Sequence, residues 1–138
     1  MLLYKNEIQS TFEAVHETVE DIMDQLKLVE KLDRQYLLFR INFMLREVLN
    51  NAVEHGNEFN EEKLIYIEVS IEESLFITKV RDEGDGIHLE PTHEHNMDYI
   101  LRERRRGITL VRQYQFELEV KHTELCVTLD LDSVVEEV

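Results

Sequence analysis

The stretch "REVLNNAVEHGN", residues 46–57, ends the most strongly helical segment of the chain. From residue 34 onward, apolar residues recur at spacings of three and four, which predicts an amphipathic helix ending near Gly56. Asparagine is a mediocre helix former, so the pair Asn50 and Asn51 is unexpected there. The stretch is either a solvated helix end or a place where a carboxylate and an amide are needed four residues apart.

Helix geometry places Glu47 and Asn51 roughly 40° apart on one face, at about 100° per residue. The centre of the apolar stripe falls roughly 60–100° round from them, so both are expected at the rim of the buried face. A glutamate there could accept a proton from a hydroxyl. An asparagine carbonyl oxygen suits Mg²⁺, which also binds phosphate. For this helix taken alone, an ordinary polar helix end is the more frequent explanation.

Length and composition restrict the class of protein. The chain has 138 residues, 43% of them hydrophobic, which suits one domain with one core. Its net charge of −15 disfavours direct contact with nucleic acid or anionic lipid and favours a basic protein partner. A single cysteine, Cys126, is compatible with a reducing cytoplasm. We expect no signal peptide and no membrane span, and hence a cytoplasmic protein.

The remaining segments predict an α+β fold, a two-layer α/β sandwich. Its mixed, mostly antiparallel sheet would be covered on one face by helices. Asp33 is the expected N-cap of the second helix. Residues 1–131 would form a single domain, followed by an acidic tail at 132–138. The other expected elements are strands at 2–11, 64–71, 75–81, 116–122 and 125–131, a helix at 12–28, and a short helix after Gly107.

The sequence "RDEGDG", residues 81–86, ends the second strand of the predicted hairpin. Two glycines let a backbone pass close to a flat ligand. The carboxylate of Asp82 could accept a hydrogen bond from an exocyclic amine such as that of adenine. Taken alone, the pattern Asp-x-Gly-x-Gly fits a plain turn equally well.

The sequence "RERRRGITLV", residues 102–111, is a basic cluster in an acidic chain. A glycine that begins a helix presents free N–H groups to an anion, and the arginines before it add forked donors for phosphate. A solvated face or a protein-docking patch explains the cluster as well when it is taken alone.

Together, and in this order, the three motifs resemble the GHKL ATP-binding superfamily. Glu-x-x-x-Asn-Ala-x-x-His-Gly is followed by Asp-x-Gly-x-Gly and then by a basic loop leading into Gly-Ile-Thr-Leu-Val. Within that superfamily the chain is most similar to stand-alone bacterial anti-sigma factor serine/threonine kinases. The resemblance runs from the first strand to Leu131, and its specificity lies in the combination of motifs.

The resemblance implies a role for each matched residue. Glu47 matches the general base, Asn51 the Mg²⁺ ligand, and Asp82 the residue that reads the adenine amine. Gly84 and Gly86 shape the loop after Asp82. Residues 87–106 match the ATP lid, which ends at a phosphate-facing helix. The remaining implied cofactor-binding residues are Arg102, Arg104, Arg105, Gly107 and Thr109.

Two positions depart from the family pattern. The lid of these kinases usually ends in Gly-x-Gly, and Arg105 stands at the first of those glycines. The arginine that precedes the lid glycines falls near Glu103, so Arg102 or Arg104 would have to replace it. Near the C-terminus, Thr123 lacks the glycine that commonly precedes it.

The implied function is an ATP- and Mg²⁺-dependent serine/threonine kinase that acts as an anti-sigma factor. Its partners would be a sigma factor and an anti-anti-sigma antagonist, which it phosphorylates, and it would form a homodimer. Arg105 motivates one alternative, a regulatory binding module with weak or no nucleotide binding. Another alternative is a trans-acting, histidine-kinase-like catalytic domain of a phosphorelay.

Overall fold

The computed structural model describes residues 1–84 and 114–134 of the chain. Within these ranges five strands form one sheet in the order β1-β2-β3-β5-β4, and each neighbouring pair is antiparallel. The strands are β1 (Leu2–Gln9), β2 (Leu64–Glu72), β3 (Leu75–Arg81), β4 (Glu117–Lys121) and β5 (Glu124–Asp130).

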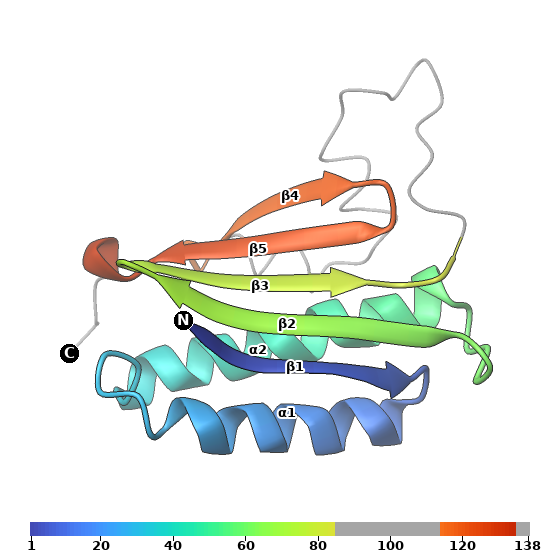
Figure 1. Ribbon diagram of the computed structural model, residues 1–138, viewed down its shortest axis with the longest axis horizontal. Coiled ribbons are helices and arrows are strands. Elements are labelled where there is room, and N and C mark those ends of the chain that lie inside the picture. Colours follow the sequence, from blue (N-terminus) through green and yellow to red (C-terminus); the bar gives the residue numbers. More distant parts are fainter. Residues whose placement is uncertain (85–113, 135–138) are drawn as a thin grey trace.

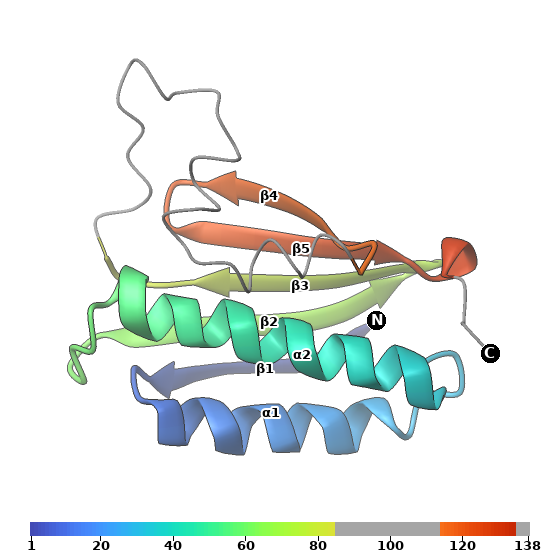
Figure 2. The same cartoon turned by 180° about the vertical axis from the view of Figure 1, so that it is seen from behind.

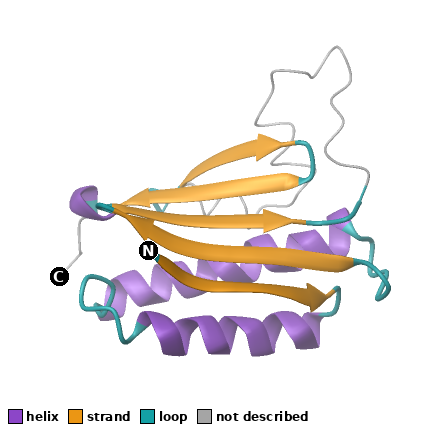
Figure 3. Ribbon diagram, viewed as in Figure 1, coloured by secondary structure: helices purple, strands orange, loops and turns teal. Residues whose placement is uncertain are grey.

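Two helices, α1 (Phe12–Leu26) and α2 (Gln35–Asn51), cover the same face of this sheet. Seen from behind, α2 crosses in front of the strands, and the other sheet face carries no helix in the described part of the chain (Figures 1 and 2). Colouring by secondary structure separates the helical layer from the strand layer (Figure 3). The two-layer α+β fold is therefore confirmed. No helix within the described ranges is both long and apolar enough to cross a membrane.

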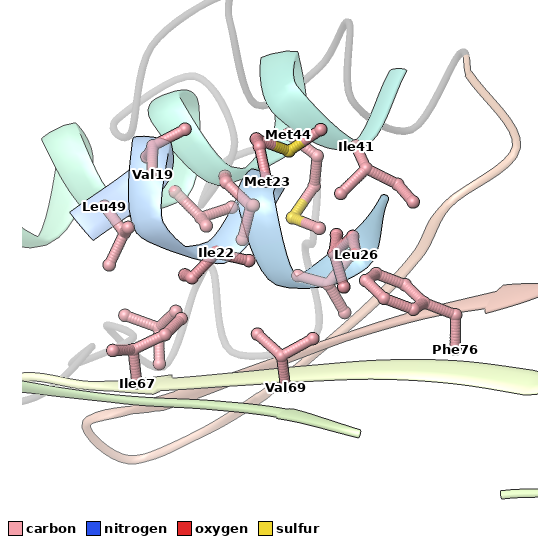
Figure 4. Packing of buried hydrophobic residues seen from close by; sticks show 14 of the residues in the cluster. Val19, Ile22, Met23, Leu26, Ile41, Met44, Leu49, Ile67, Val69 and Phe76 are labelled. Atoms are coloured by element: carbon pink, nitrogen blue, oxygen red, sulfur yellow. The ribbon is translucent and has the colours of Figure 1, made fainter. Parts of the chain in front are cut away.

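The core lies between the two layers because strand and helix periods bring their apolar faces together. In β2 every second residue from Ile65 to Ile71 is buried, and the residues between them are half-buried. Figure 4 shows helix side chains packed onto the sheet. The labelled residues are Val19, Ile22, Met23 and Leu26 from α1, Ile41, Met44 and Leu49 from α2, and Ile67, Val69 and Phe76 from the sheet.

The prediction that Asp33 caps α2 is wrong. Arg34 is the N-cap residue, without a side-chain capping bond, and Asp33 is exposed. The Asp33 N–H donates instead to the Val29 carbonyl at 3.0 Å, within the turns that join the two helices. Leu32 in this connection is fully buried. The helix begins at Gln35, one residue later than predicted. By contrast, Thr11 caps α1 by accepting from the Ala14 N–H at 3.0 Å.

Candidate functional site

The helical backbone does not fray at the end of α2. It continues as a π-helix, Ala52–Gly56, in which the Asn57 N–H donates to the Ala52 carbonyl at 2.8 Å. π-helical turns are rare and recur at functional sites. The expected end at Gly56 is confirmed, whereas the change from α-helix to π-helix in the last turn was not predicted.

Asn51 is a buried amide whose oxygen has no partner among the described residues. Its side chain is 5% exposed, and its Nδ2 donates to the Glu47 carbonyl at 2.7 Å. Within the described ranges its Oδ1 has no hydrogen-bond partner. A buried acceptor left unsatisfied costs about 1–3 kcal/mol, so a ligand that supplied a partner would recover that energy. Glu47, one turn earlier, is half-buried. The expected rim position therefore holds for Glu47, while Asn51 lies deeper than predicted.

Asp82 follows the last residue of β3 directly, as the sequence predicts. It is 8% exposed, and its Oδ1 accepts from the Gly84 N–H at 2.9 Å. Its own N–H donates to the Thr123 carbonyl at 3.3 Å. The carboxylate is thus held by its own loop, while the Asp82 backbone is held by the turn between β4 and β5. Each carboxylate oxygen can accept more than one hydrogen bond.

Gly56 and Gly84 bring the end of the π-helix that follows α2 against the loop after β3. A Cβ atom at Gly56 would overlap the Asp82 carboxylate, and one at Gly84 would overlap the Gly56 carbonyl. Both glycines are therefore required by close approach of two segments that are distant in sequence. Gly84 was predicted as a site residue, but Gly56 was predicted only as a helix stop. The one sequence feature that could have indicated a site role for Gly56 was its place in the His-Gly pair of the motif.

The structure thus brings four predicted residues to one end of the molecule: Glu47 and Asn51 on the last turns of α2, and Asp82 and Gly84 in the loop that α2 approaches. The other predicted site residues lie outside the described ranges, as do the lid at 87–106 and the short helix after Gly107. These residues are Gly86, Arg102, Arg104, Arg105, Gly107 and Thr109.

Comparison with known proteins places the chain in a family. The histidine kinase-like ATPase domain model matches residues 8–132, and the chain belongs to that family. The resemblance to the GHKL superfamily is thereby confirmed.

Among curated proteins, the chain is similar to the anti-sigma F factors of Bacillus cereus strain G9842 and Bacillus thuringiensis strain Al Hakam. Each is 32% identical over 90 residues, which cover 63% of this chain and 62% of the relative. The match therefore spans less than two thirds of these relatives. Among solved structures, the Acinetobacter baumannii histidine kinase AdeS aligns with a TM-score of 0.43 at 18% identity. That alignment covers 96% of this chain and 70% of the other.

Proposed function

We propose that this protein is an ATP-dependent serine/threonine kinase and anti-sigma factor that phosphorylates an anti-anti-sigma antagonist in a partner-switching pathway. The observation that carries the nucleotide site is the buried Asn51 Oδ1 without a partner in the described ranges, on the helix that contacts the Asp82 loop. Membership of an ATPase-domain family supports nucleotide binding. Similarity to anti-sigma F factors supports the regulatory role.

Asp82 is proposed to select adenine. Its carboxylate is buried, and its Oδ1 is oriented by the Gly84 N–H. A carboxylate accepts hydrogen bonds but donates none, so it favours the exocyclic amine of adenine over the ring carbonyl of guanine. Gly56 packs directly against the Asp82 carboxylate, and a side chain at that position would displace it.

Asn51 is proposed to hold Mg²⁺. A neutral carbonyl oxygen is a suitable ligand for this hard cation, which keeps several waters and is shared with substrate phosphates. The bond from Asn51 Nδ2 to the Glu47 carbonyl turns Oδ1 away from its own helix backbone. When bound, Mg²⁺ would neutralise charge on the phosphate oxygens.

Glu47 is proposed as the base for transfer. The hydroxyl oxygen of a serine or threonine forms a bond to the γ-phosphorus, and the bond from that phosphorus to the β–γ bridging oxygen breaks. ADP leaves, and the hydroxyl proton passes to the Glu47 carboxylate. A half-buried carboxylate one turn from Asn51 suits this role, since it is close to the proposed cation ligand but still reachable from solvent.

The binding partners follow from the relatives and from charge. A sigma factor with a basic surface would be attracted to a chain of net charge −15. We propose a cytoplasmic homodimer that binds either this sigma factor or the antagonist. Arg105, in place of a lid glycine, favours a second candidate, a module of the same fold that binds partners without transferring phosphate.

The nucleotide site is tested by titrating Mg-ATP into the wild type, Asp82→Asn and Glu83→Gln. Asp82→Asn should weaken binding by about tenfold or more, which is the value of a hydrogen bond to a charged acceptor. Glu83→Gln removes the same charge from a neighbouring exposed side chain and should bind ATP nearly as the wild type does. Equal affinity in all three proteins would exclude Asp82 as the adenine contact, and no binding in any would exclude the site.

Transfer is tested with γ-labelled ATP and the antagonist as substrate. Glu47→Gln should keep ATP affinity within a few-fold and lower the rate of transfer by about 10²–10⁴. Glu58→Gln, at an exposed position after the helix, is the matched control and should transfer normally. Nucleotide binding without transfer would favour the non-catalytic module. Acid-labile phosphohistidine would favour a phosphorelay domain.

A further inference from the structure

Asn57 directly follows the π-helix. Its side chain is almost completely buried and forms hydrogen bonds through both its nitrogen and its oxygen. It is 1% exposed. Its Nδ2 donates to Ser10 Oγ at 2.6 Å and to the Leu64 carbonyl at 3.0 Å. Its Oδ1 accepts from the Glu83 N–H at 2.8 Å. One amide therefore ties the end of β1, the start of β2 and the loop after β3 to the end of α2.

The bond to Glu83 determines how the loop after β3 sits against the helix end. The Glu83 N–H belongs to the peptide between Asp82 and the next residue, so Asn57 holds that peptide from the helix side. Asp82 itself holds the following peptide through the Gly84 N–H at 2.9 Å. Gly56, the residue before Asn57, packs against the Asp82 carboxylate with no room for a side chain. Loss of the bond to Asn57 would remove one of the contacts that fix the direction of this carboxylate.

We propose that Asn57 is a positioning residue, which aims the Asp82 carboxylate at the purine by fixing the Glu83 peptide. The inference rests on the proposed function, because it takes Asp82 as the adenine contact. Asn57 is 1% exposed, so its role is to position Asp82 rather than to bind the nucleotide directly. It acts on base selectivity, while phosphate binding depends on other residues.

Ser10 provides a matched control within the same network. Its Oγ accepts from Asn57 and donates to the Lys63 carbonyl at 2.7 Å, and it is 1% exposed. Ser10→Ala breaks these two hydrogen bonds on the side of β1 and β2 and leaves the Glu83 bond in place. Ser10→Ala therefore shows the effect of destabilising the contact with β1 and β2 while the loop after β3 keeps its bond to Asn57.

The experiment measures dissociation constants for Mg-ATP and Mg-GTP, together with thermal stability, for the wild type, Asn57→Ala and Ser10→Ala. Both variants should lose stability. The preference for ATP over GTP should fall by about tenfold in Asn57→Ala and should stay near the wild-type value in Ser10→Ala. An unchanged preference in Asn57→Ala, or an equal loss in both variants, would overturn the positioning role.

A second variant serves if Asn57→Ala does not fold. Asn57→Asp keeps an oxygen to accept from Glu83 but removes both Nδ2 donors. Its added charge weakens ATP and GTP alike, so their ratio should remain at the wild-type value, and a tenfold fall in that ratio would overturn the proposal. A wild type that binds neither nucleotide, or does not prefer ATP, would instead disprove the proposed adenine site.

Discussion

Asn51 and Asn57 are two buried amides at the same helix end, and the fold uses them in opposite ways. Asn57 has partners for its oxygen and for its nitrogen, so it stabilises the junction of four segments. Asn51 has a partner for its nitrogen, but in the described ranges none for its oxygen. An amide that is half-satisfied when buried lowers stability, and this cost is explained if the oxygen binds a ligand.

Cys126 lies on β5 between Lys79 of β3 and Glu119 of β4, which are its neighbours across the sheet. Burial raises the pKa of its thiol, Lys79 lowers it, and Glu124 and Glu119 raise it further. The net pKa is above the ordinary value, because loss of hydration disfavours the thiolate more than Lys79 favours it. Cys126 is therefore expected to be a poorly reactive thiol at neutral pH.

This expectation is checked by following thiolate absorbance against pH, since Cys126 is the one cysteine in the chain. The titration midpoint should be higher in the folded protein than in denaturant. Lys79→Met should raise the midpoint further and Glu119→Gln should lower it. A Lys79→Met midpoint below that of the wild type would contradict the assigned sign.

At the scale of the element, the turn between β2 and β3 contains a residue in an unfavourable backbone conformation. Glu73 has a φ of 56° and an exposed side chain, and β2 and β3 pair on either side of it from Glu72 and Leu75. A left-handed φ costs an ordinary residue roughly 1–2 kcal/mol, whereas glycine adopts it freely. Glu73 is therefore a less favourable residue than glycine at this position of the turn.

Glu73→Gly should raise the free energy of unfolding by about 0.5–1 kcal/mol, because relief of the backbone strain exceeds the added entropy of the unfolded chain. The measurement is urea denaturation. Glu72→Gly removes the same charge from the neighbouring strand residue and should lower stability, since glycine weakens a strand. Equal destabilisation by both substitutions would show that the conformation of Glu73 is not strained.

At the scale of the whole molecule, the charge of −15 predicts how a basic partner would associate. Long-range attraction speeds encounter and is screened by salt, with a Debye length of about 10 Å at 0.1 M. The association rate with the proposed sigma-factor partner should therefore fall roughly tenfold or more between low and high salt, while the dissociation rate changes less. Stopped-flow mixing across a salt series measures this. An association rate independent of salt would argue against charge-guided binding.

The solvent-facing side of α1 provides a variant for the same measurement. It carries Glu17, Asp21 and Asp24, all exposed. Replacing these three with Gln, Asn and Asn should slow association and flatten its salt dependence without changing the core. Unchanged kinetics would place the electrostatic contribution on another face of the molecule.

Much of the fold could be predicted, because the spacing at which apolar residues recur indicates which face of a helix or strand is buried. The β3 bounds follow from alternation and the start of α1 from spacings of three and four. The end of the helical segment follows from Gly56, since glycine commonly ends a helix. The cap of α2 was predicted one residue too early, because the turns that join the two helices include Asp33 and the helix follows Arg34. In the candidate site, Glu47, Asn51, Asp82 and Gly84 could be named from motifs, whereas the part played by Asn57 could not.

By itself, the sequence determined the two layers, the family motifs and the residues that could bind a nucleotide, because these depend on local period and on the chemistry of side chains. Tertiary structure alone decided that Gly56 lies against Asp82, that Asn57 holds the Glu83 peptide, and that Asn51 is buried with a free oxygen in the described ranges. Those features depend on the packing of α2 beside the end of β3. Contacts between residues so distant along the chain leave no periodic trace in the sequence.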